Sequence, residues 1–124
     1  AHVLFWLDLY LFGSVDGFAP PAPFGLEELD PAGLVPPRVF TKDEILAYLA
    51  HDRAKCRAAI ENLTEARAQS ICQFDWVTLT FGEMLLYNLR HVQEHTAQIS
   101  LFIGQNMTFN PRWVKQAKHG EPTA

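Results

Sequence analysis

The stretch between residues 13 and 40 constrains the fold more than any other part of the chain. It contains six prolines and four glycines, which remove backbone donors and favour turns. A long helix or a central strand is therefore excluded there, and we predict a loop that crosses between helices. A loop of this length is unusual in a compact domain and commonly covers a site or spans a bundle.

Helices are predicted on both sides of this loop. Residues 1–12 are almost continuously apolar and aromatic and end at Gly13, a helix stop signal, and we expect their helix to begin before residue 1. Thr41-Lys42-Asp43-Glu44 has the pattern of a capping box and opens a predicted helix over 41–68. A second box, Thr80-Phe81-Gly82-Glu83, opens a predicted helix over 80–104. An all-α domain with three main helices follows.

Apolar residues recur at helical spacing in the second and third of these helices, so we expect each stripe to be the buried face. Charges off the first stripe, Asp52 and Lys55 among them, are interpreted as solvated surface. The connecting residues 69–80 are expected to be a strand-like connector or an extended loop, and residues 105–124 a polar tail anchored by Trp113. The two stripes are Ile45, Leu49, Cys56, Ile60 and Leu63, and then Leu85, Leu86, Leu89, Val92, Ile99, Phe102 and Ile103.

Composition and charge narrow the functions open to the chain. Its 124 residues, 48% hydrophobic and 19% charged, suit one folded domain over 1–124. The net charge of −4, without a basic run, argues against nucleic acid as a partner. The apolar stretch from Val3 to Phe12 is shorter than the roughly 20 residues that span a bilayer, so no membrane association is expected. Two cysteines and no visible secretory signal predict a cytoplasmic protein.

His91 and His95 are the residues that most clearly suggest chemistry. They lie four positions apart in the predicted 80–104 helix, so both imidazoles project from one face and can reach one ion. Two surface or hydrogen-bonded histidines are the alternative, but an inward pair without a metal would need other partners for four ring nitrogens. We predict a divalent metal, Zn or Ni, since both accept imidazole ligands.

A third ligand must come from another helix, because two nitrogens leave a divalent ion underligated. His2 is the best candidate, since it lies on the other strongly apolar helix beside Phe5 and Trp6, which would keep water away from the ion. The weaker candidates are Glu83, Asp8 and Glu94, and the histidines interpreted as surface residues are His51 and His119.

Two other kinds of active site have little support. The segment from His91 to His95 spells His-x-x-Glu-His, the pattern of inverted zincin peptidases, but that site needs a further acidic ligand that so short a tail does not supply. Glu94 is therefore interpreted as a solvated carboxylate or a neighbour of the ligands. Cys56, on an apolar stripe, and Cys72, without a nearby base, are not expected to be nucleophiles.

These features together resemble the DinB-like superfamily. The resemblance rests on His2-Val3-Leu4-Phe5-Trp6, the long loop, a charged helix, and the segment from Asn88 to Ile99 with its H-x3-H motif and Gln98, and it spans about residues 2–110. It implies a four-helix bundle in which three histidines hold a metal. By position these are His2, His91 and His95. The first helix of that family would precede His2, so we expect either that the chain is a fragment or that a neighbouring chain covers the apolar groove left open, as in a homodimer.

The resemblance also implies a set of functions. Characterised members of that family include thiol-dependent S-transferases and a maleylpyruvate isomerase, which use a low-molecular-weight thiol as cofactor. We therefore expect a metal-dependent enzyme acting on a small molecule. A metal-dependent hydrolase is a variant of the same site, and a non-catalytic bundle that binds a metal or a small molecule is the alternative of another class. A substrate-sized cavity beside the Pro-rich loop would favour catalysis.

Overall fold

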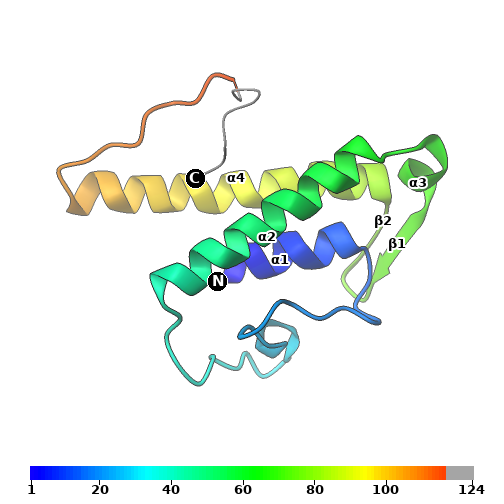
Figure 1. Cartoon of the computed structure of the whole chain (residues 1–124), viewed down its shortest axis with the longest axis horizontal. Coiled ribbons are helices and arrows are strands. Elements are labelled where there is room, and N and C mark those ends of the chain that lie inside the picture. Colours follow the sequence, from blue (N-terminus) through cyan, green and yellow to red (C-terminus); the bar gives the residue numbers. More distant parts are fainter. Residues whose placement is uncertain (117–124) are drawn as a thin grey trace. The chain divides into compact units, whose positions relative to one another are not determined.

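The computed structural model describes residues 1–116 of the chain. This part contains four α-helices, a short 3₁₀ turn and one small β-hairpin. In chain order the elements are α1 (His2–Phe12), a 3₁₀ turn η1 (Glu27–Leu29), α2 (Lys42–Glu61), α3 (Glu65–Gln69), β1 (Ile71–Phe74), β2 (Val77–Thr80) and α4 (Phe81–Asn106) (Figure 1). Two compact units can be separated, residues 1–93 and the part from residue 94 onward. None of the described helices is long and apolar enough to cross a membrane.

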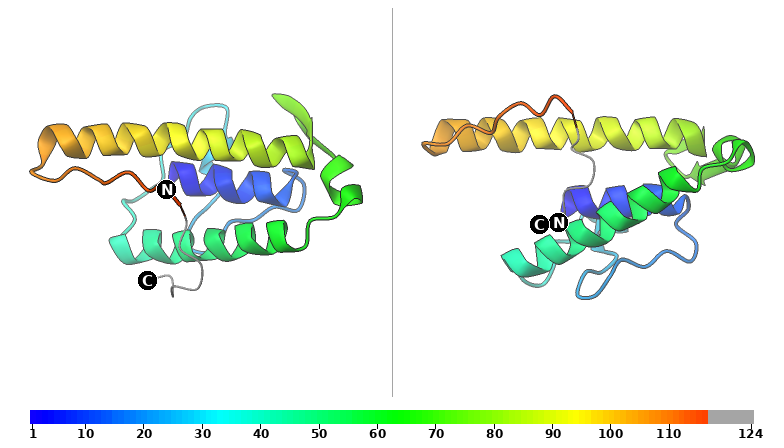
Figure 2. Two further views of the ribbon diagram at one scale, coloured as in Figure 1. Left: turned by 90° about the horizontal axis from the view of Figure 1, so that it is seen from above. Right: turned by 45° about the horizontal axis from the view of Figure 1, so that its top comes forward.

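Helix α1 is the centre of the first unit. It packs against α2 and against residues 81–93 of α4 (Figure 2). It ends where predicted, because Gly13 adopts a left-handed φ of 98° and its N–H donates to the Leu9 carbonyl. Its buried side chains join the core cluster, in which Leu9 and Met84 are fully buried.

Helix α2 begins with the predicted capping box. The Thr41 hydroxyl accepts from the Glu44 N–H, and the Glu44 carboxylate accepts from the Thr41 N–H. The single helix predicted over 41–68 is interrupted, however. Helix α2 ends at Glu61, and a new cap, in which Thr64 accepts from the Arg67 N–H, starts the short α3. The cap that Thr64 forms inside the predicted helix therefore starts a new helix, although the apolar pattern continues across it.

The buried face of α2 differs from the predicted one. Its buried residues are Tyr48 and Asp52, whereas Ile60 on the predicted stripe is 58% exposed. The interpretation of Asp52 as a solvated charge was wrong, since its side chain is fully buried. The contacts of Tyr48 with the Pro-rich loop and with α1 select this face, because Phe24 of the loop stacks on the Tyr48 ring at 4.5 Å.

The connector between α3 and α4 is a two-stranded antiparallel hairpin, which an all-α prediction omits. Phe74 pairs with Val77 at its turn, and Ile71 pairs with Thr80 at its open end. Alternate residues of β1, Cys72 and Phe74, enter the core. The indole N–H of Trp76 donates to the Tyr10 hydroxyl at 3.2 Å, so the hairpin is tied to α1.

Helix α4 starts at the second predicted capping box, in which Thr80 and Glu83 exchange hydrogen bonds. It continues beyond Gly104 to Asn106, so that glycine does not stop it. In its first half the Asn88 amide donates to the Leu7 carbonyl of α1 at 3.1 Å.

Two further predictions about this end of the chain were wrong. On the predicted apolar face of α4, Leu86 and Leu89 are 69% and 55% exposed, and the buried residues are instead Phe81, Met84 and Asn88. Trp113, predicted as the anchor of the tail, is 84% exposed. His119, interpreted as a surface residue, lies outside the described residues.

The Pro-rich stretch is a loop, as predicted, with only the 3₁₀ turn η1 as regular structure between residues 13 and 41. Phe24 lies against both Phe40 and Tyr48, at 4.4 and 4.5 Å between ring centroids. Phe18 is buried in the core and meets Phe5 of α1 edge-on. Aromatic contacts thus hold the loop to the helices, although the loop lacks the regular backbone hydrogen bonds of a helix or a sheet.

Candidate metal centre

His2 is held by the Pro-rich loop. It lies in the first turn of α1, and its Nδ1 is 2.7 Å from Oε2 of Glu28 in η1. The Trp6 indole donates to the same oxygen at 2.9 Å. Because a carboxylate only accepts, the His2 Nδ1 carries the hydrogen, and in the neutral ring Nε2 carries the lone pair. This is the arrangement by which carboxylates orient metal-binding histidines.

The pair in α4 has the predicted spacing. His91 and His95 lie one helical turn apart on this continuous helix. The His91 ring meets the His2 ring at 5.6 Å, with the planes at 63°. The Nδ1 of His95 is 2.8 Å from Oε1 of Gln98, and since an amide oxygen accepts, Nε2 of a neutral His95 also carries a lone pair.

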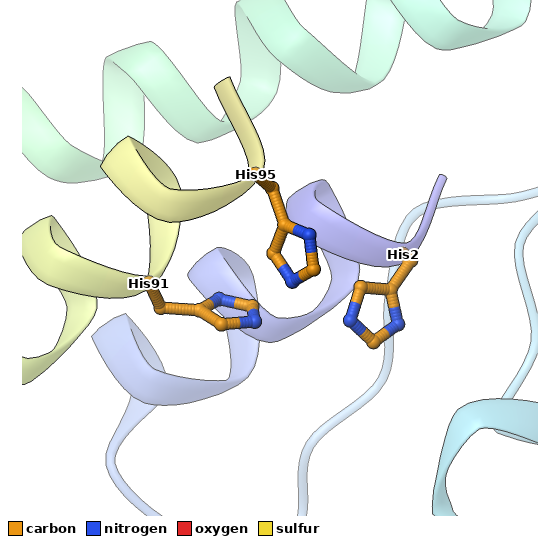
Figure 3. Close-up of side chains that lie close together, drawn as sticks. All are labelled: His2, His91 and His95. Atoms are coloured by element: carbon orange, nitrogen blue, oxygen red, sulfur yellow. The ribbon is translucent and has the colours of Figure 1, made fainter. Parts of the chain in front are cut away.

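The three predicted ligands come together. One nitrogen of each ring lies within 4.8 Å of the others, and Figure 3 shows the rings of His2, His91 and His95 turned toward one another. Three imidazole nitrogens from two helices are a donor set that suits Zn or Ni. The residues present therefore fit the group that the sequence predicts, and the His2 side chain, 49% exposed, leaves the position accessible.

The weaker ligand candidates lie elsewhere. Glu83 is engaged in the cap of α4, and Glu94 is exposed. Asp8 is fully buried in the packing of α1 on α2, where Lys55 contacts it. The described structure therefore groups none of these carboxylates with the three histidines.

A pocket lies beside His2. Its cavity volume is only about 20 Å³, enough for about one water molecule, so it is not the substrate-sized cavity that would favour catalysis. Glu28, whose carboxylate contacts His2, is among its lining residues. The Pro-rich loop supplies most of its wall. The lining residues are Ala1, Phe5, Phe24, Gly25, Glu27, Glu28, Leu34, Pro36 and Phe40.

A second group with metal-binding side chains lies between α1 and α2. Ligand atoms of Asp8, His51 and Asp52 are all within 4.8 Å of one another. His51, interpreted as a surface residue, is indeed 44% exposed, but its Nε2 reaches to 3.4 Å from Oδ1 of Asp8. Sequence reasoning missed this group. The available signal was Asp8 itself, because an acid inside an apolar helix must find basic or hydroxyl partners on another element.

Burial sets the acidity of several groups around α2 and the hairpin. The pKa of Asp52 is raised to about 8, first by burial and then by the charge of Asp8. Burial also raises the pKa of the Cys56 thiol, with a contribution from Asp52, and that of the Cys72 thiol. A raised pKa disfavours the thiolate that a cysteine nucleophile requires.

Comparison with known proteins agrees with this helical arrangement. A family model described as the DinB superfamily matches residues 1–99, the part that contains α1, α2, the hairpin and both histidine-bearing segments. No curated protein and no solved structure was found to match the chain. Because the match covers most of the sequence, the chain belongs to the DinB superfamily.

Proposed function

We propose that this chain is a metal-dependent enzyme in which His2, His91 and His95 bind a Zn or Ni ion. The observation that carries the proposal is the convergence of one nitrogen from each histidine within 4.8 Å. Glu28 and Gln98 would orient two of the rings through their Nδ1 atoms, and Nε2 of each of these rings would bind the ion. In this proposal the three helices α1, α2 and α4 belong to a four-helix-bundle arrangement.

The reaction that fits best is thiol-dependent S-transfer to a small electrophilic molecule. A divalent ion supplies Lewis acidity, which lowers the pKa of a thiol or water that binds it. The chain's own residues would do the rest. Phe5, Phe24 and Phe40 line the small pocket next to Glu28, and Glu28 would hold the His2 ring. Low-molecular-weight thiols are kept reduced in the cytoplasm, where we propose that the protein works.

Metal content tests the first part of this proposal. The protein would be purified without a metal-affinity tag, and elemental mass spectrometry would compare wild type with the H91A/H95A variant. We expect close to one Zn or Ni per chain in wild type and almost none in the variant. Equal metal content in the two proteins would refute the histidine site.

Turnover tests the second part. The metal-loaded protein would be screened with low-molecular-weight thiols against electrophilic substrates, with H91A/H95A as the control. Thiol-dependent product from wild type alone would support the transferase. Thiol-independent ester or amide hydrolysis would instead support the hydrolase, and a tightly held metal without turnover would favour the non-catalytic binding protein.

We further propose that two copies associate through the exposed apolar side of α2. Leu46, Leu49 and Ile60 are 49%, 37% and 58% exposed, and the helical period puts them on one face. An apolar face of this kind is more often an interface than free surface.

A further inference from the structure

The packing of α1 on α2 contains an unusual concentration of charge. Asp8 and Asp52 are both fully buried. Asp8 is well satisfied, since the Tyr48 hydroxyl donates to it at 3.1 Å and the Lys55 ammonium forms an ion pair with it. One ammonium thus faces two buried carboxyl groups. The His51 imidazole, 3.4 Å from Asp8, adds a positive charge only when it is protonated, so with a neutral ring the cluster has a deficit of positive charge.

Asp52 bears that deficit. Neither of its carboxylate oxygens accepts a hydrogen bond from any residue in the described part of the chain. A buried carboxylate without partners costs several kcal/mol in a protein interior. Protonation removes the charge, consistent with the raised pKa of Asp52, but the second oxygen still lacks a donor. Two buried acceptor oxygens without a donor in the described part of the chain are groups that a bound cation would satisfy.

The geometry around Asp52 suits such a cation. Ligand atoms of Asp8, His51 and Asp52 lie within 4.8 Å of one another, and the closest measured pair, His51 Nε2 and Asp8 Oδ1, is 3.4 Å apart. Donors bound to one ion lie at such separations when each metal–ligand bond is about 2.1 Å. His51 is 44% exposed and provides a route from solvent.

We propose that Asp8, His51 and Asp52 form a binding site for a divalent cation of the Mn²⁺ type, separate from the three histidines and independent of the proposed function. Two carboxylates and one imidazole are donors that Mn²⁺ accepts, whereas Mg²⁺ and Ca²⁺ prefer oxygen alone. On binding, both carboxyl groups would hold the ion as carboxylates, and the Lys55 ammonium would leave Asp8. Lys55 is 27% exposed, so its side chain can move outward.

Lys55 therefore acts as an internal competitor for the cation. Its Nζ also donates to the Asp8 carbonyl at 3.0 Å and lies over the rings of Phe12 and Phe18 at 5.4 and 5.5 Å. These contacts hold the ammonium at Asp8 when no cation is present. Removing the ammonium should increase the affinity for a divalent cation, whereas a purely structural ion pair would give no such gain.

Mn²⁺ binding tests the site. The H91A/H95A background removes the histidine centre, and electron paramagnetic resonance of free Mn²⁺ measures binding. We expect one Mn²⁺ per chain, at least tenfold weaker binding after Asp52→Asn, and at least tenfold tighter binding after Lys55→Met. Asp43→Asn, which removes an exposed carboxylate from the first turn of α2, is the matched control and should leave the affinity unchanged.

A second variant keeps the test informative if Asp52→Asn fails to fold. His51 is nearly half exposed, so His51→Ala should preserve the fold, as circular dichroism would verify, and should weaken Mn²⁺ binding. Absence of stoichiometric Mn²⁺ in the H91A/H95A background, or the same affinity in the Asp52, His51 and Asp43 variants, would overturn the proposal.

Discussion

Among single residues, Glu28 connects more features of the molecule than any other. One of its oxygens contacts His2 Nδ1 and accepts from the Trp6 indole, and the residue also lines the neighbouring pocket. Its position in a Pro-rich loop gave no sequence signal, because a contact between residues 28 and 2 depends on how the loop returns to α1. The grouping of the three histidines was predictable from motif and spacing, but the contact of Glu28 with one of them was not.

Glu28→Gln should weaken the binding of Zn at the proposed centre about 10- to 100-fold, the usual effect of losing a carboxylate that orients a ligand. The amide can still contact the ring but no longer fixes its tautomer or raises its basicity. Competition with a chromophoric chelator would measure the affinity. Glu27→Gln, at the adjacent position in η1, is the control, and equal affinities in the two variants would remove Glu28 from this role.

Leu9→Ala should destabilise the protein by about 2–5 kcal/mol, because the Leu9 side chain is fully buried in the core cluster and its truncation leaves a cavity. Urea unfolding followed by circular dichroism would give the change in the free energy of unfolding. Val39→Ala, at a side chain 91% exposed, should change it by less than about 0.5 kcal/mol. Similar values for both variants would contradict the position of the core.

Among the elements, short sequence motifs predicted where helices begin better than where they end or which face they bury. Both capping boxes were confirmed, because each involves only residues three apart. The buried face of α2 was mistaken because periodicity shows that a stripe is apolar, not that anything covers it. Asp52 and Lys55 are on the inner side only because Asp8 of α1 lies opposite, and that pairing is long-range.

The capping box at the start of α2 predicts how the Glu44 carboxyl group titrates at low pH. The pKa of Glu44 is lowered to about 2, mainly by its hydrogen bonds from Arg38 and then from the Thr41 N–H. A carboxyl whose pKa is lower in the folded state stabilises the fold above its usual pKa of 4.5, and this contribution is lost as the pH falls from there to about 2. Carbon-13 NMR of the Glu44 side chain should therefore titrate near pH 2.

A variant controls that titration. Arg38→Met removes the guanidinium hydrogen bonds at 2.9 and 2.6 Å but keeps the contact of Glu44 with Thr41. Its Glu44 midpoint should move upward toward 4.5. A wild-type midpoint already near 4.5 would mean that the capping box does not hold the carboxylate in solution.

For the whole molecule, a helical protein with a long crossing loop was predictable, and the family match over residues 1–99 agrees with it. The hairpin was foreseen only as a connector, since four-residue strands leave too short a pattern to distinguish from a loop. The aromatic packing of Phe24 on Tyr48 and the cluster around Asp8 were not predictable, because both depend on the path of the loop and on the pairing of α1 with α2.

For the whole molecule we predict that two copies associate in solution. Analytical ultracentrifugation should find the protein as a dimer at tens of micromolar, and Ile60→Lys should shift it toward monomer by placing a charge on the exposed apolar side of α2. Glu61→Lys adds the same side chain at the next residue, and we expect it to remain dimeric. A monomeric wild type would exclude this interface.

Glu28 would also couple the small pocket to the proposed metal centre, and such a coupling has a thermodynamic consequence. A water molecule or small ion that enters this pocket of about 20 Å³ would meet the same carboxylate that contacts His2. If the occupant alters that contact, it alters the affinity for the ion, and by reciprocity the ion must alter the affinity for the occupant by the same factor. Binding of the metal and occupation of the pocket would then be two linked binding equilibria, and both would act on Glu28 of the Pro-rich loop.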